Sequence, residues 1–320
     1  MEKVLITGIT GFVGSHLAEL LLSRKDYEVY GTIRHNRSPT VNIDHIMDKI
    51  RLESCDLTDA SSIDRVVREV RPDYIFHLAA QSYVPYSWKN PNQTLTNNSS
   101  STLNLFEAVI KAKIDPVIQI AGSSEEYGMV YENEVPIKET NTLRPMSPYG
   151  VSKVTQDKLA LQYFMSYKLK TIVTRAFNHT GPRRGDVFAT SSFAKQIALI
   201  EKGKQEKIVH GNLEAKRDFT DVRDMVKAYE LAVLKCDSGE EYNICSGYEG
   251  TFSIRIVLEK LIRLSKAEFK TEQDPERMRP SDVSILHGDC SKFKEKTGWK
   301  PEIPFDKTLE DLLNYWRERV

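Results

Sequence analysis

The chain has 320 residues, and its 45 lysines and arginines are balanced by 45 aspartates and glutamates. Hydrophobic residues make up 40% of the chain and charged residues 28%, a composition that supports a packed core and argues against intrinsic disorder. Proteins that bind nucleic acids through their phosphates usually carry a basic excess, so we expect no nucleic-acid partner. The four cysteines form no C-x-x-C pair and are too few for a disulfide framework.

No membrane or secretory segment is expected. No apolar run approaches the roughly 20 residues that span a bilayer. Residues 1–6 run directly into an apolar strand, without the pattern of a signal peptide. We therefore predict a cytoplasmic protein with no membrane partner.

The first half of the chain alternates short β-branched runs with amphipathic segments. Strands are expected at residues 4–7, 27–32, 50–54, 74–78, 117–121 and 171–175, and helices at about 12–23, 61–70 and 101–111. Such alternation is typical of βαβ units. The predicted fold class is therefore α/β, with a Rossmann-type doubly wound parallel sheet.

The second half of the chain is less regular. Helices are expected at residues 193–201, 222–235, 253–264 and 309–317, and strands at 206–210 and 241–244. We interpret this part as a smaller mixed α/β lobe that binds the substrate. The predicted division assigns residues 1–175 and about 213–245 to the sheet domain, and about 176–212 and 246–320 to the smaller lobe.

Three glycines, Gly8, Gly11 and Gly14, follow the first predicted strand and open the first helix, with Phe12 and Val13 between the last two. A loop that turns tightly and lets its backbone approach a pyrophosphate excludes Cβ atoms, and the helix N-terminus behind it supplies N–H donors. The strand–loop–helix context favours a dinucleotide site over an ordinary βα turn.

The ends of the next strands indicate which dinucleotide binds. An NAD site normally has an acidic residue after the second strand. Here Arg34 and Arg37 follow that strand, and their guanidinium groups suit a 2′-phosphate. NADP is the favoured cofactor, with NAD and a merely solvated basic loop as alternatives. Asp56 and Leu57 are predicted to contact the adenine. The cofactor is also predicted to run along Ala79, Ala80 and Gln81. The alternative role of the two alanines is tight packing.

A predicted helix begins at Ser147 and Pro148, because serine is a good N-cap and proline a good first helical residue. Tyr149 and Lys153 are then four residues apart on one face. Lowering the tyrosine pKa by about 3 units requires about 4 kcal/mol. An ammonium about 4 Å away supplies that much at an effective dielectric near 20. We expect Tyr149 to exchange a proton while Ser123, just past a strand, hydrogen-bonds the same substrate oxygen.

These motifs together resemble the extended short-chain dehydrogenase/reductase family of nucleotide-sugar enzymes, over essentially the whole chain. Residues 122–128, 144–149, 177–185 and 217–224 resemble GDP-mannose 4,6-dehydratases, and also the GDP-4-keto-6-deoxymannose reductases that act next. One departure is Ser101, where the family usually has glycine. The extra Cβ bears on helix packing near the cofactor.

The resemblance implies hydride transfer between NADP and C4 of a hexose. A dehydratase also needs a third acid or base, and Glu125 stands where the resembling dehydratases carry their glutamate. We favour the dehydratase, converting GDP-mannose to GDP-4-keto-6-deoxymannose through internal hydride transfer. Related reductases can carry the same Ser-Ser-Glu-Glu-Tyr stretch, so the reductase stays an alternative, and a non-catalytic NADP-binding regulator is a second one.

A GDP-sugar substrate needs positive partners for its diphosphate, and the guanine is implied by the resemblance alone. The candidate substrate-binding residues are Asn178, Arg183, Arg184, Lys195, Arg217 and Arg279. Arg183 and Arg184 have an alternative interpretation, in the loop beside the cofactor and at a subunit interface. A homodimer is expected, with a homotetramer as the alternative.

No metal site is predicted. Asp218, Asp221 and Asp224 are three residues apart near a predicted helix start, which fits helix capping and solvation better than metal binding. His77 lies inside an apolar strand and is interpreted as a satisfied core histidine.

Overall fold

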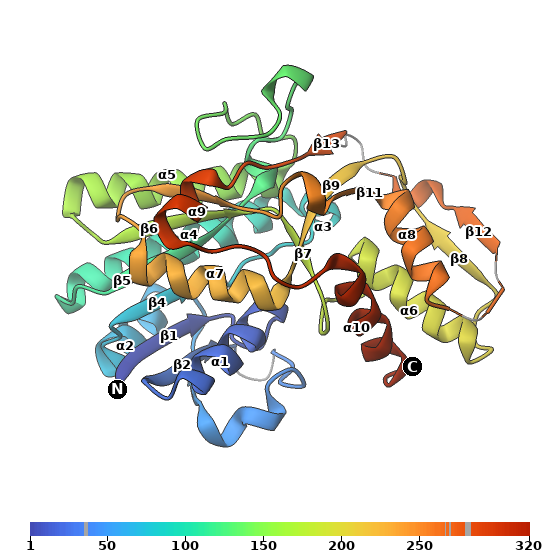
Figure 1. Ribbon diagram of the computed structural model, residues 1–320. Helices are drawn as coiled ribbons and strands as arrows, with labels where there is room; N and C mark the ends of the chain where they lie inside the picture. Colours follow the sequence, from blue (N-terminus) through green and yellow to red (C-terminus); the bar gives the residue numbers. More distant parts are fainter. Residues whose placement is uncertain (35–37, 266, 269, 279–282) are drawn as a thin grey trace.

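A parallel sheet of seven strands forms the larger part of the molecule in the computed structural model, which describes residues 1–34, 38–265, 267–268, 270–278 and 283–320 (Figure 1). The strand order is β10-β6-β5-β4-β1-β2-β3. These strands are β1 (Glu2–Thr7), β2 (Tyr27–Ile33), β3 (Arg51–Ser54), β4 (Tyr74–His77), β5 (Val117–Ser123), β6 (Thr171–Ala176) and β10 (Glu241–Ile244). The order reverses at β1, which confirms the predicted doubly wound α/β sheet.

Helices cover both faces of the sheet because its strands are apolar on both sides. Val4 and Ile6 of β1 belong to one apolar cluster, with α1 (Phe12–Arg24) and α7 (Val222–Lys235). Leu5, between them, points to the opposite face, as the period of two in a strand requires. That face is covered by α2 (Ala60–Val70), α4 (Pro91–Ala112) and α5 (Pro148–Tyr167).

A smaller lobe lies beside the carboxyl ends of the strands, on the right of Figure 1. Its third apolar cluster joins α6 (Ala189–Glu201), α8 (Ile254–Arg263) and α10 (Phe305–Arg317). Its strands are β7 (Asn178–Thr180), β8 (Lys207–His210), β9 (Lys216–Asp221), β11 (Thr251–Ser253), β12 (Lys270–Gln273) and β13 (Ile285–Leu286). Two further helices are α3 (Val84–Lys89) and α9 (Ser291–Thr297). A 3-10 segment, η1 (Asp44–Lys49), lies between β2 and β3 in the chain.

The main departure from the expected elements is α4, which begins at Pro91 rather than near Ser101. Its first half is rich in Asn, Ser and Thr, which predict a non-helical segment. The structure explains the helix by buried polar contacts: the amide of Asn98 donates to the carbonyl of Gln81 at 3.1 Å and to the hydroxyl of Ser152 at 2.9 Å. Ser101, in the glycine position of the family, is buried and donates to the carbonyl of Asn98.

No helix in the described part of the chain is both long and apolar enough to span a bilayer.

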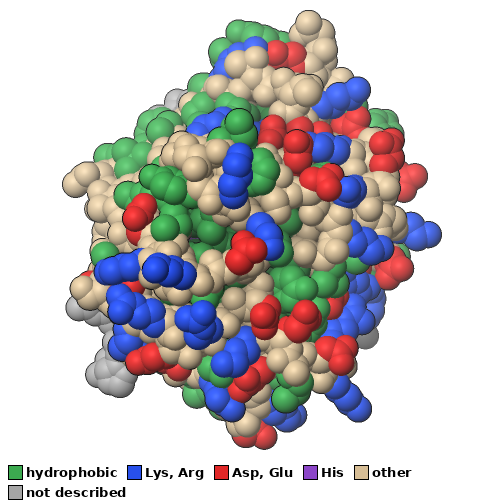
Figure 2. All heavy atoms as spheres, turned by 90° about the vertical axis from the view of Figure 1, so that its left-hand side faces the viewer, with side chains coloured by type: hydrophobic (Ala, Val, Ile, Leu, Met, Phe, Trp, Pro, Cys, Tyr) green, Lys and Arg blue, Asp and Glu red, His purple; other side chains and the backbone are tan. Residues whose placement is uncertain are grey.

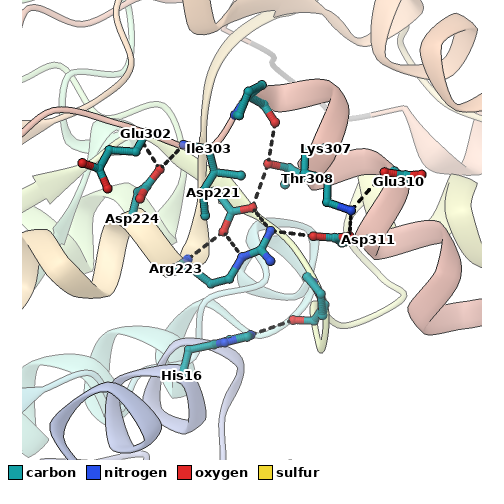
Figure 3. Close-up of polar contacts among 12 residues, drawn as sticks. His16, Asp221, Arg223, Asp224, Glu302, Ile303, Lys307, Thr308, Glu310 and Asp311 are labelled. Atoms are coloured by element: carbon teal, nitrogen blue, oxygen red, sulfur yellow. Dashed lines mark hydrogen bonds and ion pairs between the residues drawn. The ribbon is translucent and has the colours of Figure 1, made fainter. Parts of the chain in front are cut away.

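Two aspartates, one at the N-cap and one in the first turn of α7, attach the C-terminal segment to the sheet domain (Figure 3). Asp221 caps α7 by accepting the N–H of Arg223, and it also accepts the hydroxyl of Thr308 in α10 at 2.8 Å. Oδ2 of Asp224 accepts the N–H groups of Glu302 and Ile303 at 2.8 and 2.7 Å. The predicted capping role is therefore confirmed for Asp221.

The predicted solvation of these aspartates is wrong. Asp218, Asp221 and Asp224 are 0%, 2% and 0% exposed. Oxygens of Asp218 accept the N–H groups of Ser246 and Gly247, both at 2.8 Å. The backbone donors replace water, which a spacing of three residues could not reveal. Within the described ranges, the acidic and histidine side chains form no cluster that could hold a metal ion.

Replacing Asp224 with alanine leaves the N–H groups of Glu302 and Ile303 without their acceptor. We expect Asp224→Ala to lower the free energy of unfolding by about 2–4 kcal/mol. Urea denaturation measures this loss. The matched control is Asp306→Ala, whose carboxylate is exposed and pairs with Lys260, and it should change stability by less than about 0.5 kcal/mol. Equal losses in the two variants would contradict this account.

Candidate active site

The loop between β1 and α1 forms a cradle of backbone atoms. Gly8 has a φ of +74°, and the N–H of Gly11 returns to the carbonyl of Gly8 at 3.0 Å. A Cβ on Gly14 would lie 2.8 Å from Cα of Ile9 and overlap the carbonyl oxygen of Gly8. Gly11 is the N-cap of α1 and supplies no side-chain hydrogen bond. The N–H groups of Phe12 and Val13 can therefore donate hydrogen bonds to a phosphate.

The predicted residues after β4 line the same edge of the sheet. The hydroxyl of Thr7 accepts the N–H groups of Leu78 and Ala79, both at 3.1 Å. A Cβ on Gly8 would lie 3.1 Å from Cα of Ala79, so the two loops are in close contact, and Ala80 and Gln81 continue from there. Among the described residues, Oε1 of the buried Gln81 amide has no hydrogen-bond partner. The cradle and this oxygen both fit a polar ligand.

The adenine end of the predicted cofactor site is less defined. Oδ1 of Asp56 accepts the N–H and the hydroxyl of Thr58, at 3.0 and 2.7 Å, so this oxygen shapes its own turn. Leu57 is buried, and its carbonyl accepts the amide of Asn104. Arg34 is exposed at the end of β2, and Arg37 lies outside the described residues.

Tyr149 and Lys153 come together at the start of α5. As predicted, Ser147 caps this helix by accepting the N–H of Gly150 at 3.0 Å. Nζ of Lys153 donates to the carbonyl of Ala121 in β5 at 2.7 Å and lies 5.8 Å from the centre of the Tyr149 ring. Both side chains are buried: Lys153 is 4% exposed and Tyr149 is 8% exposed. The lysine thus fastens the beginning of α5 to the end of β5.

The expected lowering of the Tyr149 pKa is wrong for the protein on its own. Burial raises the pKa of Tyr149 above its ordinary value, and the hydrogen bond with Ser123 and the charge of Arg184 oppose this only in part. Burial also lowers the pKa of Lys153 to about 8, against the effect of Glu126. Spacing on a helix predicts the neighbours of a group but not its desolvation, which is the largest effect here.

The end of β5 and the turn that follows it place two polar side chains, Ser123 and Glu125, next to Tyr149. Ser123 is the N-cap of the short 3-10 helix η2 (Ser124–Glu126), and its hydroxyl accepts the N–H of Glu125 at 3.2 Å. The charge of the Glu125 carboxylate acts on Tyr149, in the direction that raises the tyrosine pKa. The predicted catalytic residues Ser123, Glu125, Tyr149 and Lys153 therefore lie together at the carboxyl end of β5.

Two adjacent arginines in the loop after β7 have different surroundings. The guanidinium of Arg183 pairs with Glu19 and donates to the hydroxyl of Ser15, so it is directed to α1. This is the cofactor-side position given above as the alternative to substrate binding. Arg184 stacks on the ring of Phe188, with 3.5 Å between its central carbon and the ring centre, and on Phe12 at 5.0 Å.

The remaining predicted substrate residues are spread over the smaller lobe. A cleft of about 560 Å³ is lined by Ser192, Lys195, Lys207, Arg277 and other residues of this lobe. Nζ of Lys195 pairs with Asp186 at 2.6 Å. Arg217 is buried in β9 and donates to the carbonyl of Val283 at 2.7 Å. Asn178 begins β7, and Arg279 lies outside the described residues.

A chain segment connects the cleft with the tyrosine. Arg184, whose charge acts on Tyr149, is followed after eight residues by Ser192 at the cleft. The loop is tied to α1 through the carbonyl of Pro182, which lies 3.0 Å from Nε2 of His16 (Figure 3). One short stretch of chain therefore contains both Arg184 and residues that line the cleft.

The fold and the site define a dinucleotide-binding α/β enzyme of the extended short-chain dehydrogenase/reductase class. The family model "GDP-mannose 4,6 dehydratase" matches residues 5–312, and the chain belongs to this family.

Individual relatives fall on both sides of the expected alternatives. The GDP-6-deoxy-D-mannose reductase of Pseudomonas aeruginosa is 33% identical over 320 residues, which cover 100% of this chain and 98% of the reductase. The human GDP-mannose 4,6 dehydratase is 35% identical over 340 residues, covering 97% of this chain and 90% of the dehydratase. The solved structure of RMD from Pseudomonas aeruginosa complexed with NADPH has a TM-score of 0.87 at 32% identity, with 100% of both chains covered.

The structure adds residues that the sequence analysis did not single out. Glu126 is fully buried behind Ser123, and Asn98 supports both the loop at Gln81 and the helix at Ser152. The sequence gives no indication of which of the two adjacent carboxylates, Glu125 or Glu126, faces the core. His77, by contrast, is confirmed as a core histidine, with Thr7 and Thr102 each 3.0 Å from its ring nitrogens.

A side chain at Gly14 would press α1 away from the glycine loop. We expect Gly14→Ala to lower stability by about 1–3 kcal/mol, because the added methyl group meets backbone atoms that cannot rotate away. Thermal unfolding measures the effect. In Gly185→Ala the new Cβ meets only the Phe188 ring, at 3.8 Å, so this control should melt close to wild type. A Gly14→Ala protein of wild-type stability would contradict the close packing of the cradle.

Proposed function

We propose that this protein is an NADP-dependent GDP-mannose 4,6-dehydratase. The observation that carries the proposal is the meeting of Ser123, Glu125 and Tyr149 at the end of β5. A reductase needs a proton donor at C4 of the sugar, which Tyr149 and Ser123 supply. A dehydratase needs a further acid or base for C5 and C6, and we assign this role to the Glu125 carboxylate, whose charge acts on Tyr149.

The residues around the glycine loop fit NADP. The uncapped start of α1, at Gly11, Phe12 and Val13, would hold the pyrophosphate. Arg34 would hold the 2′-phosphate, Asp56 and Leu57 the adenine side, and the Ala79–Gln81 backbone the ribose and nicotinamide side. The RMD structure that shares the fold was solved with NADPH, which supports NADP, with NAD as the alternative.

Each polar group then has a defined task in the reaction. NADP, when bound, would supply the hydride transfer between C4 and C6, and the residues of this chain hold and move the protons. Tyr149 takes the proton of the C4 hydroxyl while Ser123 hydrogen-bonds that oxygen, and Glu125 takes the proton from C5. Water leaves from C6 after receiving one proton, and C5 receives another. The two protons taken up by Tyr149 and Glu125 equal the two given back, so the enzyme returns to its starting state.

The substrate would extend from the phenol into the smaller lobe. We assign the hexose to the space at Tyr149, the diphosphate to Arg184 and Lys195, and the nucleoside to the cleft of about 560 Å³. Asn178 and Arg217 are assigned to substrate on the family resemblance, as is Arg279. In this assignment the predicted sheet domain, residues 1–175 and about 213–245, binds the cofactor, apart from β9, which lies in the sheet of the smaller lobe. The remainder binds the substrate, and the enzyme works in the cytoplasm.

The reductase is the second candidate, and the alignments favour it in one respect. The Pseudomonas aeruginosa reductase aligns with this chain almost end to end, over 320 positions. The human dehydratase needs 340 aligned positions and extends beyond this chain, with 90% of its length covered. A GDP-4-keto-6-deoxymannose reductase would use the same Tyr149 and Ser123, with Glu125 as a bystander.

Incubation with GDP-mannose, without added nicotinamide, separates the two activities. A dehydratase regenerates its bound cofactor in every turnover, so we expect many equivalents of 4-keto-6-deoxy sugar per enzyme, detected by mass spectrometry. Glu125→Gln should abolish this product, because C5 keeps its proton. Conversion of only the keto sugar, with one NADPH consumed per product, would identify the reductase and contradict our assignment.

We also propose that the chain forms a homodimer through α4 and α5. Exposed apolar side chains follow the outer faces of these two helices: Leu103, Val151, Leu161, Met165 and Tyr167, between 39% and 62% exposed. On the face of the molecule in Figure 2, apolar side chains lie among charges of both signs rather than in a field of one sign. A second copy of the same two helices would cover this stripe as a four-helix bundle.

Placing charges in this stripe should separate the subunits. We expect wild type to sediment as a dimer at micromolar concentration and Leu161→Arg/Met165→Arg to sediment as a monomer. Leu234→Arg, at an apolar side chain of α7 that is 47% exposed, is the matched control and should stay dimeric. A wild-type monomer, or a dimer that survives the double substitution, would exclude this interface, and a tetramer that falls to dimers would indicate a second interface elsewhere.

A further inference from the structure

Glu126 is a buried carboxylate that the proposed reaction does not use. It is 0% exposed, at the end of η2. Its Oε1 accepts the backbone N–H of Ser123 at 2.7 Å, while the hydroxyl of Ser123 accepts the N–H of Glu125. This reciprocal pair fixes the turn that carries Ser123. A Cβ on Gly122 would lie 2.8 Å from the same Oε1, so the carboxylate fills the space behind the end of β5.

Lys153 reaches the same three residues from the other side. Its Nζ donates to the carbonyl of Ala121, two residues before the N–H that Glu126 accepts. One buried cation and one buried anion therefore hold Ala121 and Ser123, the first and last residues of a tripeptide that ends β5. Displacing either group would move the Ser123 hydroxyl relative to the Tyr149 phenol.

The buried charges at Glu126 sum to zero only when Lys153 is protonated. The charged and titratable groups that face Glu126 are Tyr149, Lys153 and Asp157 of α5, Arg175 of β6 and Tyr127 at the end of η2. Arg175 bonds to Asp157 at 2.9 Å and to the hydroxyl of Tyr127 at 3.1 Å, and it is 3.7 Å from Glu241 of β10.

Arg175 is therefore largely committed to Asp157. Its Nε is 3.5 Å from Oε2 of Glu126, an ion-pair distance without a hydrogen bond. Among the described residues, Oε2 of Glu126 has no hydrogen-bond partner at all. Two carboxylates and two cations are buried together, and both cations act on Glu126, Arg175 more strongly than Lys153. Glu126 is the carboxylate whose charge opposes the lowering of the Lys153 pKa by burial, and Lys153 in turn opposes the raising of the Glu126 pKa.

We propose that Glu126 is a positioning residue of this active site, which fixes Ser123 through its backbone and keeps Lys153 charged beside Tyr149. The roles of Ser123 and Tyr149 rest on the proposed function, whereas the coupling of Glu126 to Lys153 does not. Glu126 thus acts on the chemistry through two neighbours and touches neither substrate nor cofactor.

The substitution Glu126→Gln separates charge from hydrogen bonding. The amide oxygen of glutamine can still accept the N–H of Ser123, but the countercharge of Lys153 is gone. Titration of Lys153 by NMR, with ¹³Cε-labelled lysine assigned through Lys153→Met, should show a lysine pKa about one unit or more below that of wild type. If the protein is active, the alkaline limb of its pH–rate profile should move down by the same amount.

Glu132→Gln is the matched control, because Glu132 is an exposed carboxylate in the 3-10 turn η3 (Glu132–Glu134). This variant should leave the Lys153 titration unchanged. A merely structural role for Glu126 would lower the melting temperature and leave the lysine pKa in place, which would overturn the proposal, as would an equal shift in the control. If Glu126→Gln does not fold, wild-type protein with ¹³C-labelled glutamate decides: coupled charges titrate in shared steps, and independent titration of Glu126 and Lys153 would overturn the proposal.

The titration does not depend on turnover. An enzyme inactive on both sugar nucleotides would refute the proposed function, while the Lys153 shift would still support or overturn the role of Glu126.

Discussion

The site depends on the attachment of the start of α5 to the end of β5. Lys153 makes this attachment by donating to the carbonyl of Ala121 at 2.7 Å. Because the bond joins a buried ammonium to a strand end, the phenol one helical turn earlier is held over the same edge of the sheet as the glycine loop. The Ser147 cap fixes where the helix begins, and the turn at Ser123 then faces the phenol.

Burial disfavours the charged forms of Tyr149 and Lys153, and neighbouring charges offset this effect in part. Desolvation favours the neutral phenol of Tyr149 and the neutral amine of Lys153, so both pKa values move in the direction unfavourable to proton abstraction. The charge of Arg184 opposes the pKa shift of Tyr149, and the charge of Glu126 opposes the pKa shift of Lys153 while it adds to that of Tyr149. In the proposed reaction, Tyr149 takes a proton only as the phenolate, a form that positive charge held close to it stabilises.

Sequence reasoning predicts those parts of the site that follow from local structure. The glycine loop, the N-cap at Ser147 and the Tyr149–Lys153 spacing each have a short-range physical cause, and the structure has each where it was expected. The long polar start of α4 was not predictable, since its helix depends on Asn98 contacts with residues far away in sequence. Burial of Asp218, Asp221 and Asp224, and the choice of Glu126 rather than Glu125 as the inward carboxylate, were likewise set by tertiary packing.

The central claim is that the Tyr149 hydroxyl transfers the proton in a nucleotide-sugar reaction. The most direct measurement compares wild type with Tyr149→Phe for two quantities, the amount of NADP(H) retained on purification and the turnover of GDP-mannose. The account predicts equal retention and a loss of turnover of about 10²–10⁴-fold. Undiminished turnover by a protein that lacks this hydroxyl would contradict it.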